Sequence, residues 1–524
     1  MVKYRLDNTL PLWAKENLMN GLKLNVKRTI LVGFAFFLIS AFWQAYDAIV
    51  PLILTNHFGL PQTVSGAVMS LDNVLAVFLL PIFGALSDKI CTKKWGRRTP
   101  FILVGTIAAV ICFVFLAFVD SLQFNTLIEA GIHDRYVTAQ ALMDSAKEAL
   151  KEAKAIGDQV GIAAANASID AINASIDAIR ADVLELSLSN IWPLITFIGV
   201  LLLVLISMAT FRSPAVALMP DVTVKPLRSK GNAIINLTGT AGGILVLVLG
   251  MIFKTSTLSM QYIGYVIAVV AIMITGLVVF MLTVKEKKWA QDMEEDTVRY
   301  GLEEPVKSDE PAESRNLSKA EFKSLLLILA SVALWYIGYN SITSKYSVYA
   351  SNILGFDFNM TLIIAQAAAI VSYIPVGIIA SKLGRRKTIL AGVAMLASAF
   401  AIGIFIEPTT PEFIMFPVFI LAGMGWATIN VNSFPMVVEL AKGGNVGKYT
   451  GYYYTASMAA QIVAPILSGV LYDLLGMRYT FFTFGAIFVA FSFVTMFFVK
   501  HGDAKDLAGK TAKDLISDNF AGED

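Results

Sequence analysis

Long apolar runs separated by short polar segments set the pattern of this chain. A membrane-spanning helix needs about 20 mostly apolar residues, and twelve runs reach that length. They lie near 30–54, 64–87, 101–119, 190–211, 231–253, 260–283, 322–350, 360–381, 388–406, 412–438, 449–471 and 479–499. Six precede and six follow the charged segment 285–320, which has no apolar periodicity and is expected to be a passive or regulatory linker. The pattern predicts an all-α membrane protein with twelve transmembrane helices.

One long polar segment interrupts the regular spacing. Residues 120–189 are alanine-rich, and the apolar residues from 169 to 186 alternate spacings of three and four. Such spacings place apolar side chains on one face of a helix. With Gly157 and Gly161 near a turn, we expect 137–156 and 162–187 to form a helical hairpin outside the membrane. The hairpin is either a structural insertion or a binding surface for an external partner.

Basic residues predict how the chain crosses the membrane. Lys and Arg concentrate before the first run and in every second junction, on the side opposite the hairpin. The positive-inside rule therefore places both termini and the linker in the cytoplasm. The expected segments are a cytoplasmic N-terminal segment 1–29, a six-helix bundle 30–284 with an extracytoplasmic insertion 120–189, a linker 285–320, a second bundle 321–500 and a cytoplasmic tail 501–524.

Composition excludes several classes of function. The chain is 56% hydrophobic and 15% charged, whereas soluble domains carry about 25% charged residues. A net charge of +2 with scattered bases gives no nucleic-acid-binding patch. The two cysteines and three histidines have no metal-ligand spacing, and no phosphate-binding glycine loop or nucleophile elbow occurs. We expect no enzymatic activity, no cofactor and no metal.

The two halves contain corresponding segments. GALSDKICTKKWGRRTP (84–100) follows the second run, and GIIASKLGRRKT (377–388) follows the eighth. Segments around the fourth and fifth runs likewise have counterparts around the tenth and eleventh. Two parallel six-helix repeats are typical of secondary transporters whose substrate site lies between the repeats, near the middle of the bilayer.

These segments carry a family resemblance. Residues 84–100 resemble the loop signature of the major facilitator superfamily, a Gly, three residues and an Asp before a basic stretch with Gly-Arg-Arg. The additional Cys91-Thr92, and the segment RSPAVALMPDVT (212–223), resemble more narrowly the sucrose-transporter-like branch, which is related to the glycoside-pentoside-hexuronide cation symporters. The chain departs from the plant sucrose carriers at Gln62, where they have a histidine. The resemblance implies a major facilitator fold, a sugar or glycoside substrate and a coupling cation.

Charged residues inside the apolar runs are candidates for cation coupling. An ionised side chain at a helix centre costs roughly 2.5–3.5 kcal/mol on insertion, so it needs a functional or pairing role. Asp47 lies in the first run, Asp72 in the second and Lys345 in the seventh. We expect Asp47 or Asp72 to hold the coupling cation, with Lys345 as counter-ion. The alternative for Asp72 is a structural hydrogen bond to a neighbouring helix.

Polar and aromatic residues in the apolar runs are candidates for substrate binding. Aromatic faces stack on sugar rings, while carboxylates and amides exchange hydrogen bonds with hydroxyl groups. The first and seventh runs, by resemblance, line the central cavity. The expected substrate-binding residues are Trp43, Gln44, Asp47, Asn236, Asn340, Lys345, Gln366, Trp426, Asn430, Tyr454 and Gln461. Asn236 shares a stripe of small and polar residues with Gly239, and such a stripe serves close helix packing as often as ligand binding.

A third group of charges lies at the predicted membrane edge. Opposite charges there can pair when one side of a transporter is closed and separate when that side opens. The expected gating residues are Asp88, Arg97, Arg98, Arg212, Asp221, Arg228 and Glu439. We expect their pairs to hold the two halves together.

The sequence thus favours a monomeric sugar or glycoside:proton symporter that works by alternating access. Its expected location is a plasma membrane or a bacterial inner membrane, with the lipid bilayer, the substrate and the coupling proton as its partners. Sodium coupling and facilitated transport or export of another solute are the alternatives within transport. A non-transporting membrane sensor or scaffold is the alternative of a different class.

Overall fold

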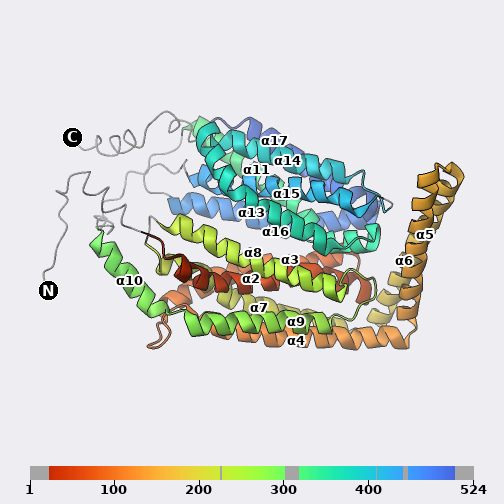
Figure 1. Ribbon diagram of the computed structural model, residues 1–524, viewed down its shortest axis with the longest axis horizontal. Coiled ribbons are helices and arrows are strands. Elements are labelled where there is room, and N and C mark those ends of the chain that lie inside the picture. Colours follow the sequence, from red (N-terminus) through yellow and green to blue (C-terminus); the bar gives the residue numbers. More distant parts are fainter. Residues whose placement is uncertain are drawn as a thin grey trace.

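Helices dominate the chain (Figure 1), and the computed structural model describes residues 23–224, 227–300, 318–408, 410–438, 440 and 446–501. The N-terminal half contains α2 (Val26–Leu52), the π-helix η1 (Ile53–His57), α3 (Gln62–Lys89), α4 (Thr99–Glu129), α5 (Ile132–Ile156), α6 (Gln159–Ser189), α7 (Trp192–Asp221), α8 (Arg228–Phe253), α9 (Ile263–Thr283) and α10 (Glu286–Arg299). The C-terminal half contains α11 (Lys319–Thr343), α12 (Tyr346–Val348), the π-helix η3 (Tyr349–Leu354), α13 (Phe358–Leu383), α14 (Arg385–Gly403), the 3-10 helix η4 (Glu412–Ile414), α15 (Met415–Val438), α16 (Val446–Leu475) and α17 (Met477–Phe497).

The predicted membrane architecture is confirmed. Eleven helices in the described residues are long and apolar enough to cross a membrane. The remaining predicted run, 360–381, corresponds to α13, a 26-residue helix that includes the apolar stretch Phe358–Tyr373. The protein is therefore an all-helical, multi-pass membrane protein.

The two halves pack their helices in the same way. In the N-terminal half α2 contacts α8 and α9, α4 contacts α7 and α9, and α3 contacts α7. In the C-terminal half α11 contacts α16 and α17, α14 contacts α15 and α17, and α13 contacts α15. Each pair in one half has its counterpart six spans later. This correspondence is the structural form of the repeat that the sequence indicates.

The halves meet along two helix pairs, α3 with α16 and α8 with α13. Glycine makes the first contact possible: a Cβ on Gly66 would collide with the backbone of Pro465, and a Cβ on Gly469 with the backbone of Gln62. Small residues let helix backbones approach closely inside a membrane, where dispersion contacts replace the hydrophobic effect. The halves are therefore in direct backbone contact on this side.

The helical hairpin is confirmed, with α5 and α6 as its two arms. It leaves the ends of α4 and α7 and runs crosswise over one end of the bundle, which we call the hairpin end (Figure 1). We call the opposite end, where α10 lies, the linker end. Gly131 and Gly157, both at φ 70°, bound α5. The predicted apolar seam forms the hairpin interior, with Ile169, Ile176, Ile179 and Val183 at most 2% exposed.

The charged linker departs from the expected tether. Its first part, Glu286–Arg299, forms the helix α10, although the segment has no apolar period. Two contacts hold this helix to the N-terminal half: Trp289 is buried, and Arg28 pairs with Asp292 at 2.7 Å. Arg28 also lies over the Trp289 ring, 5.5 Å from its centre. Residues 301–317 lie outside the described residues. A few specific contacts hold α10 against the N-terminal half, and the apolar periodicity of the sequence does not reveal such contacts.

Candidate transport site

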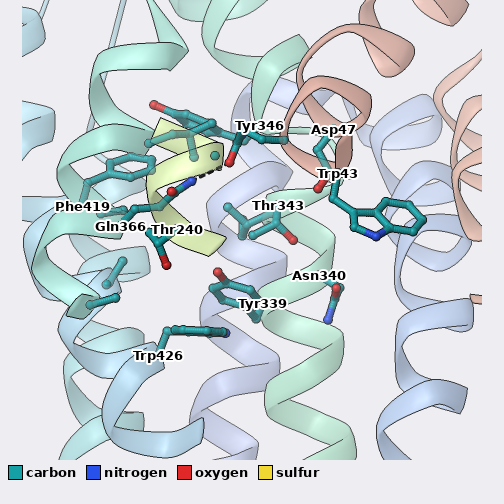
Figure 2. A pocket seen from close by; sticks show the side chains of 18 of the residues that line it. Trp43, Asp47, Thr240, Tyr339, Asn340, Thr343, Tyr346, Gln366, Phe419 and Trp426 are labelled. Carbon is teal, nitrogen blue, oxygen red and sulfur yellow. Dashed lines mark hydrogen bonds between the residues drawn. The ribbon is translucent and has the colours of Figure 1, made fainter. Parts of the chain in front are cut away.

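A cavity with a volume of about 510 Å³ lies between the two halves. Helices α2 and α8 line it from one half, and α11, α13 and α15 from the other. Figure 2 shows side chains from both halves pointing into the same space. The predicted substrate-binding residues that line it are Trp43, Gln44, Asp47, Asn236, Asn340, Gln366 and Trp426. The structure therefore brings together seven residues that lie far apart in the sequence.

The face of α2 that enters the cavity is the one that the sequence predicts. Ser40, Trp43, Gln44 and Asp47 all line the cavity, because helix positions three and four apart share a face. The side-chain amide of Gln366 donates a hydrogen bond to Gln44 Oε1 across the two halves. Both side chains line the cavity, and Gln366 is labelled in Figure 2.

Aromatic rings also line the cavity. Tyr339 and Trp426 stack with their ring centres 6.0 Å apart and an interplanar angle of 26°, and Tyr373 meets Trp426 edge-on at 6.4 Å. The indole Nε1 of Trp43 is buried and has no hydrogen-bond partner among the described residues. Since buried indole N–H groups usually find an acceptor, this donor is available to a ligand. The cavity offers flat apolar surfaces together with amide and carboxylate groups.

A second, smaller cavity of about 160 Å³ adjoins the first on the side of α3 and α7. Asp47, Trp43 and Asn340 line both cavities, and Asp72 and Arg212 line the second. Arg212 lies over the Trp43 ring, 5.4 Å from its centre, and Asp72 accepts a hydrogen bond from Asn73 Nδ2 at 2.7 Å. Arg212, expected at a gate, is therefore inside the bundle and supplies the positive charge nearest to Asp72.

The predicted counter-ion, Lys345, takes a different position. Its side chain is fully buried, and its Nζ donates to the backbone carbonyl of Gln62 at 3.2 Å. The acid that faces it is Asp473, and Lys345 lines neither cavity. The predicted pairing of Lys345 with Asp47 or Asp72 is therefore corrected: α11 ends at Thr343, and the turn that follows directs this side chain toward the hairpin end.

The remaining predicted substrate residues divide into two groups. Gln461 lines the second cavity, and Asn430 bonds to the hydroxyl of Tyr373, a residue of the first cavity. Tyr454 is 50% exposed, lies beside Phe434 and lines neither cavity. The stripe of small and polar residues on α8 serves both helix packing and cavity lining. Gly239 admits the close approach of Phe36 and Ser40, while Asn236 faces the first cavity.

Contacts between the halves at the hairpin end were missed by the sequence analysis. Asn56 in η1 and Asn352 in η3 exchange side-chain hydrogen bonds of 3.2 and 3.0 Å, and both are buried. Asp473 of α16 accepts from the backbone N–H groups of Gln62 and Thr63 at 2.7 Å, where α3 begins. A signal was present, because TNHFG (55–59) and SNILG (351–355) occupy equivalent places in the two repeats.

A buried histidine–aspartate pair lies beside this closure. His57 Nδ1 and Asp120 Oδ1 are 2.6 Å apart, and both side chains are at most 1% exposed. Gln123 donates to the backbone carbonyl of His57 at 2.9 Å. The sequence gives no signal for the pair, since its members lie in different spans and have no characteristic spacing.

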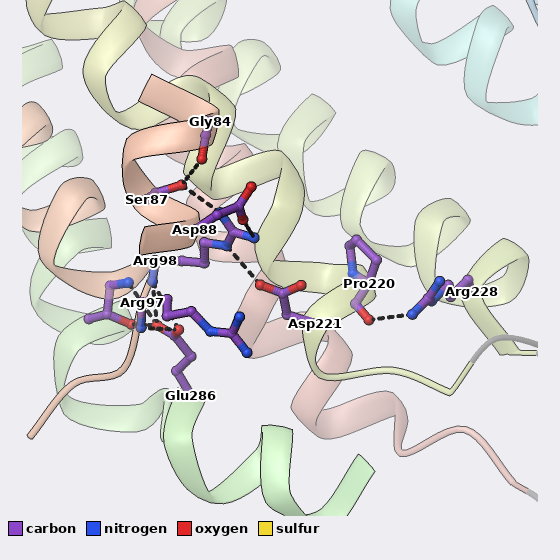
Figure 3. A network of polar contacts seen from close by, with 10 residues as sticks. Gly84, Ser87, Asp88, Arg97, Arg98, Pro220, Asp221, Arg228 and Glu286 are labelled. Carbon is purple, nitrogen blue, oxygen red and sulfur yellow. Dashed lines mark hydrogen bonds and ion pairs between the residues drawn. The ribbon is translucent and has the colours of Figure 1, made fainter. Parts of the chain in front are cut away.

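At the linker end, Arg98 is the centre of a polar network (Figure 3). Its guanidinium bonds to Asp88 Oδ1 at 2.5 Å, to Ser87 Oγ at 2.5 Å and to Asp221 Oδ2 at 2.7 Å. Burial alone would lower the pKa of Arg98, but the pairs with Asp221 and Asp88 outweigh it and raise that pKa above its ordinary value. The network ties the ends of α3, α4 and α7 together.

Glu286, which the sequence analysis did not single out, completes this network. Its carboxylate accepts from the backbone N–H of Arg97 at 2.6 Å, of Arg98 at 2.9 Å and of Thr99 at 2.7 Å. These groups lie at the start of α4, where backbone N–H groups have no helical partner and the helix dipole favours negative charge. Glu286 is 5% exposed and therefore anchors the start of α10 to the start of α4.

The network corrects the expected gate in one respect. The residues that contact Arg98 and Glu286 belong to the N-terminal half and α10, so these pairs stabilise one half and do not bridge the two. Arg228 bonds to the backbone carbonyls of Pro220 and Thr223 (Figure 3). Glu439 lies outside the described residues.

A cavity that lies between two helical repeats and is lined by membrane-spanning helices of both is typical of secondary transporters. A sequence profile described as Major Facilitator Superfamily matches residues 183–457 and 362–520, and one described as MFS/sugar transport protein matches residues 31–132. The chain belongs to the major facilitator superfamily, and it is a membrane transporter.

Curated relatives match over short stretches. The proton-associated sugar transporter A of Homo sapiens is 40% identical over 63 residues, which are 12% of this chain and 8% of the relative. The MFS-type transporter ppzB of Metarhizium rileyi is 31% identical over 106 residues, 20% of this chain and 21% of the relative. The chain thus matches at most about a fifth of the length of these relatives. They agree with the sugar-transporter resemblance seen in the sequence.

Solved structures match over nearly the whole chain. A D-xylose-proton symporter has a TM-score of 0.53 at 12% identity and covers 91% of this chain and 99% of its own. A mutant of the nucleoside transporter NupG has a TM-score of 0.54 at 13% identity and covers 90% and 100%. Identities this low establish the shared fold alone.

Proposed function

We propose that this protein is a secondary active symporter that moves a sugar or glycoside together with a proton by alternating access. The observation that carries the proposal is the 510 Å³ cavity between the halves, whose lining combines the stacked rings of Tyr339 and Trp426 with Asp47 and several side-chain amides. Pyranose rings have apolar C–H faces and polar hydroxyl edges, which fit these two kinds of surface. The relatives named as proton-associated sugar transporters favour the same substrate class.

The surroundings of Asp47 and Asp72 favour a proton over sodium. The two acids line one 160 Å³ cavity, so protonation of one relieves the repulsion between them. Arg212 lines the same cavity, and a guanidinium beside the site repels a metal cation while tolerating a neutral, protonated carboxyl. Within the described residues no three His, Cys, Asp or Glu side chains gather as metal ligands. We infer that Asp47 accepts the transported proton beside the substrate and that Arg212 provides a positive charge facing Asp72.

The sidedness of the chain follows from its charges. The loops at the linker end carry Lys89, Lys93, Lys94, Arg97 and Arg98, and the positive-inside rule places such loops in the cytoplasm. The hairpin end then faces outward, and the N-terminal segment, the linker and the C-terminal tail face the cytoplasm. The Asn56–Asn352 and Asp473 contacts close the outward end. We infer that the structure represents an inward-facing state.

Uptake into proteoliposomes tests the proposal. With a panel of mono- and disaccharides, an imposed proton gradient is expected to drive accumulation and a sodium gradient is not. Asp47→Asn removes the proton acceptor while preserving shape, so it is expected to abolish accumulation against a gradient and to spare exchange. Unchanged uphill uptake by Asp47→Asn sinks the coupling role, and the absence of any gradient-driven sugar flux favours a sensor over a transporter.

A further inference from the structure

We propose that the hairpin α5/α6 is a strap that stabilises the closed state of the hairpin end. The inference rests on alternating access, because only a transporter whose halves separate at this end has a use for a reversible strap. It assigns a role to the insertion, which contributes no residue to either cavity.

The base of the strap is fixed to the N-terminal half by apolar packing. Leu127, Ile132, Tyr136 and Leu258 form one buried cluster with the hairpin interior. Tyr136 also donates to the backbone carbonyl of Asn56 at 3.2 Å. Contacts of this kind are lost only when apolar surface is exposed to water. The base therefore moves as one body with the N-terminal half.

The outer part of the strap reaches the C-terminal half through polar contacts. Lys147 of α5 donates to the backbone carbonyl of Leu354, the last residue of η3, at 2.6 Å. Asp170 of α6 pairs with Arg478 of α17 at 3.0 Å. Such contacts exchange readily for contacts with water. The strap thus has a permanent attachment to one half and a releasable attachment to the other.

The backbone at Leu354 and Gly355 leaves room for the side chain of Lys147. Leu354 is buried, and the next residue, Gly355, adopts φ 64°, a conformation that favours glycine. A Cβ on Gly355 would occupy the position of Lys147 Nζ. Leu354 lies two residues after Asn352, whose side chain pairs with Asn56 of the other half. Lys147 therefore binds the segment of the C-terminal half that must move away when this end opens.

Distances between two spin labels test the strap without any substrate. Cys91 and Cys112 are first replaced by Ser, and labels are attached at Leu188→Cys on α6 and Phe405→Cys beyond α14, both strongly exposed. Double electron–electron resonance then reports the fraction of molecules that are open at the hairpin end. Because the readout needs no transport, the experiment can refute the strap without refuting symport. Equally, a failure of the proposed symport would leave this result unaffected.

Lys147→Ala is expected to raise the open fraction roughly five- to tenfold, in line with the net loss of one hydrogen bond. Lys151→Ala, on an exposed lysine one turn further along α5, is the matched control and is expected to leave the distribution unchanged. Arg478→Asp is expected to raise the open fraction about two- to fivefold. Adding Asp170→Arg to Arg478→Asp restores an ion pair and is expected to reverse that increase.

Distributions identical to the parent in both Lys147→Ala and Arg478→Asp overturn the proposal. So does an Arg478→Asp effect that Asp170→Arg fails to reverse, because the change would then not act through the strap. If Lys147→Ala is not monodisperse by gel filtration, the charge exchange between positions 170 and 478 decides the question by itself.

Discussion

Replacing Glu286 by Gln tests how the start of α10 is held to the N-terminal half. The carboxylate accepts three backbone N–H groups and the Thr99 hydroxyl, at 2.6 to 2.9 Å. Gln keeps the shape but removes the negative charge and turns one acceptor into a donor that faces other donors. A hydrogen bond to a charged group contributes about 1.5–3 kcal/mol, and the helix-terminal charge adds about 0.3–1 kcal/mol.

We expect Glu286→Gln to lower stability by about 2–3 kcal/mol and Tm by roughly 2–3 °C. The assay is thermal unfolding of the detergent-solubilised protein, followed by intrinsic fluorescence. Glu295→Gln is the matched control, because Glu295 is exposed on the same helix and its substitution removes the same charge. Equal Tm values for Glu286→Gln and Glu295→Gln would refute the anchoring role, because the buried carboxylate would then stabilise no more than a solvated one.

Three further changes test the site and the strap. Trp43→Phe keeps the ring and removes the unpartnered Nε1 donor, so we expect sugar binding, measured by calorimetry, to weaken about two- to tenfold; unchanged affinity contradicts a ligand bond there. Gly355→Ala strains φ 64° and displaces Lys147, so the spin-label distances should show an open fraction at least as large as in Lys147→Ala. Burial lowers the pKa of Lys147 to about 8, although Asp144 and Glu412 oppose this effect. In the open state the amine is exposed and recovers its ordinary pKa of 10.5. The population of the closed state should therefore increase as the pH rises from 8 to 10.5 and stay constant below pH 8. If Lys147→Ala shows the same pH dependence, Lys147 is not its cause.

The fold could be predicted from the sequence because apolar length is a direct physical requirement. Each span needs enough apolar residues to cross the bilayer, so the runs, the hairpin seam and the repeat are all visible in the pattern. The α2 face with Trp43, Gln44 and Asp47 could also be predicted from the sequence, since helical spacing alone places these residues together. These predictions depend on local periodicity and therefore carry over to the structure.

Pairings across helices could not be predicted in the same way. Lys345 and Arg212 are both bases in or beside the apolar runs, yet one faces Asp473 and the other lines the cavity of Asp72. Which base meets which acid depends on how the helices rotate and where α11 ends. Glu286 looked like one charge among many in a polar linker, and only the fold brings it to the start of α4.

Proton movement coupled to sugar tests the central claim most directly. Proteoliposomes loaded with a pH-sensitive dye and given no ion gradient receive a sugar that the carrier binds. The account predicts that sugar entry acidifies the lumen in the parent protein, and that Asp47→Asn in vesicles preloaded with the same sugar exchanges it without any pH change. Sugar entry by the parent with no proton movement, or identical acidification by Asp47→Asn, would contradict proton symport through Asp47.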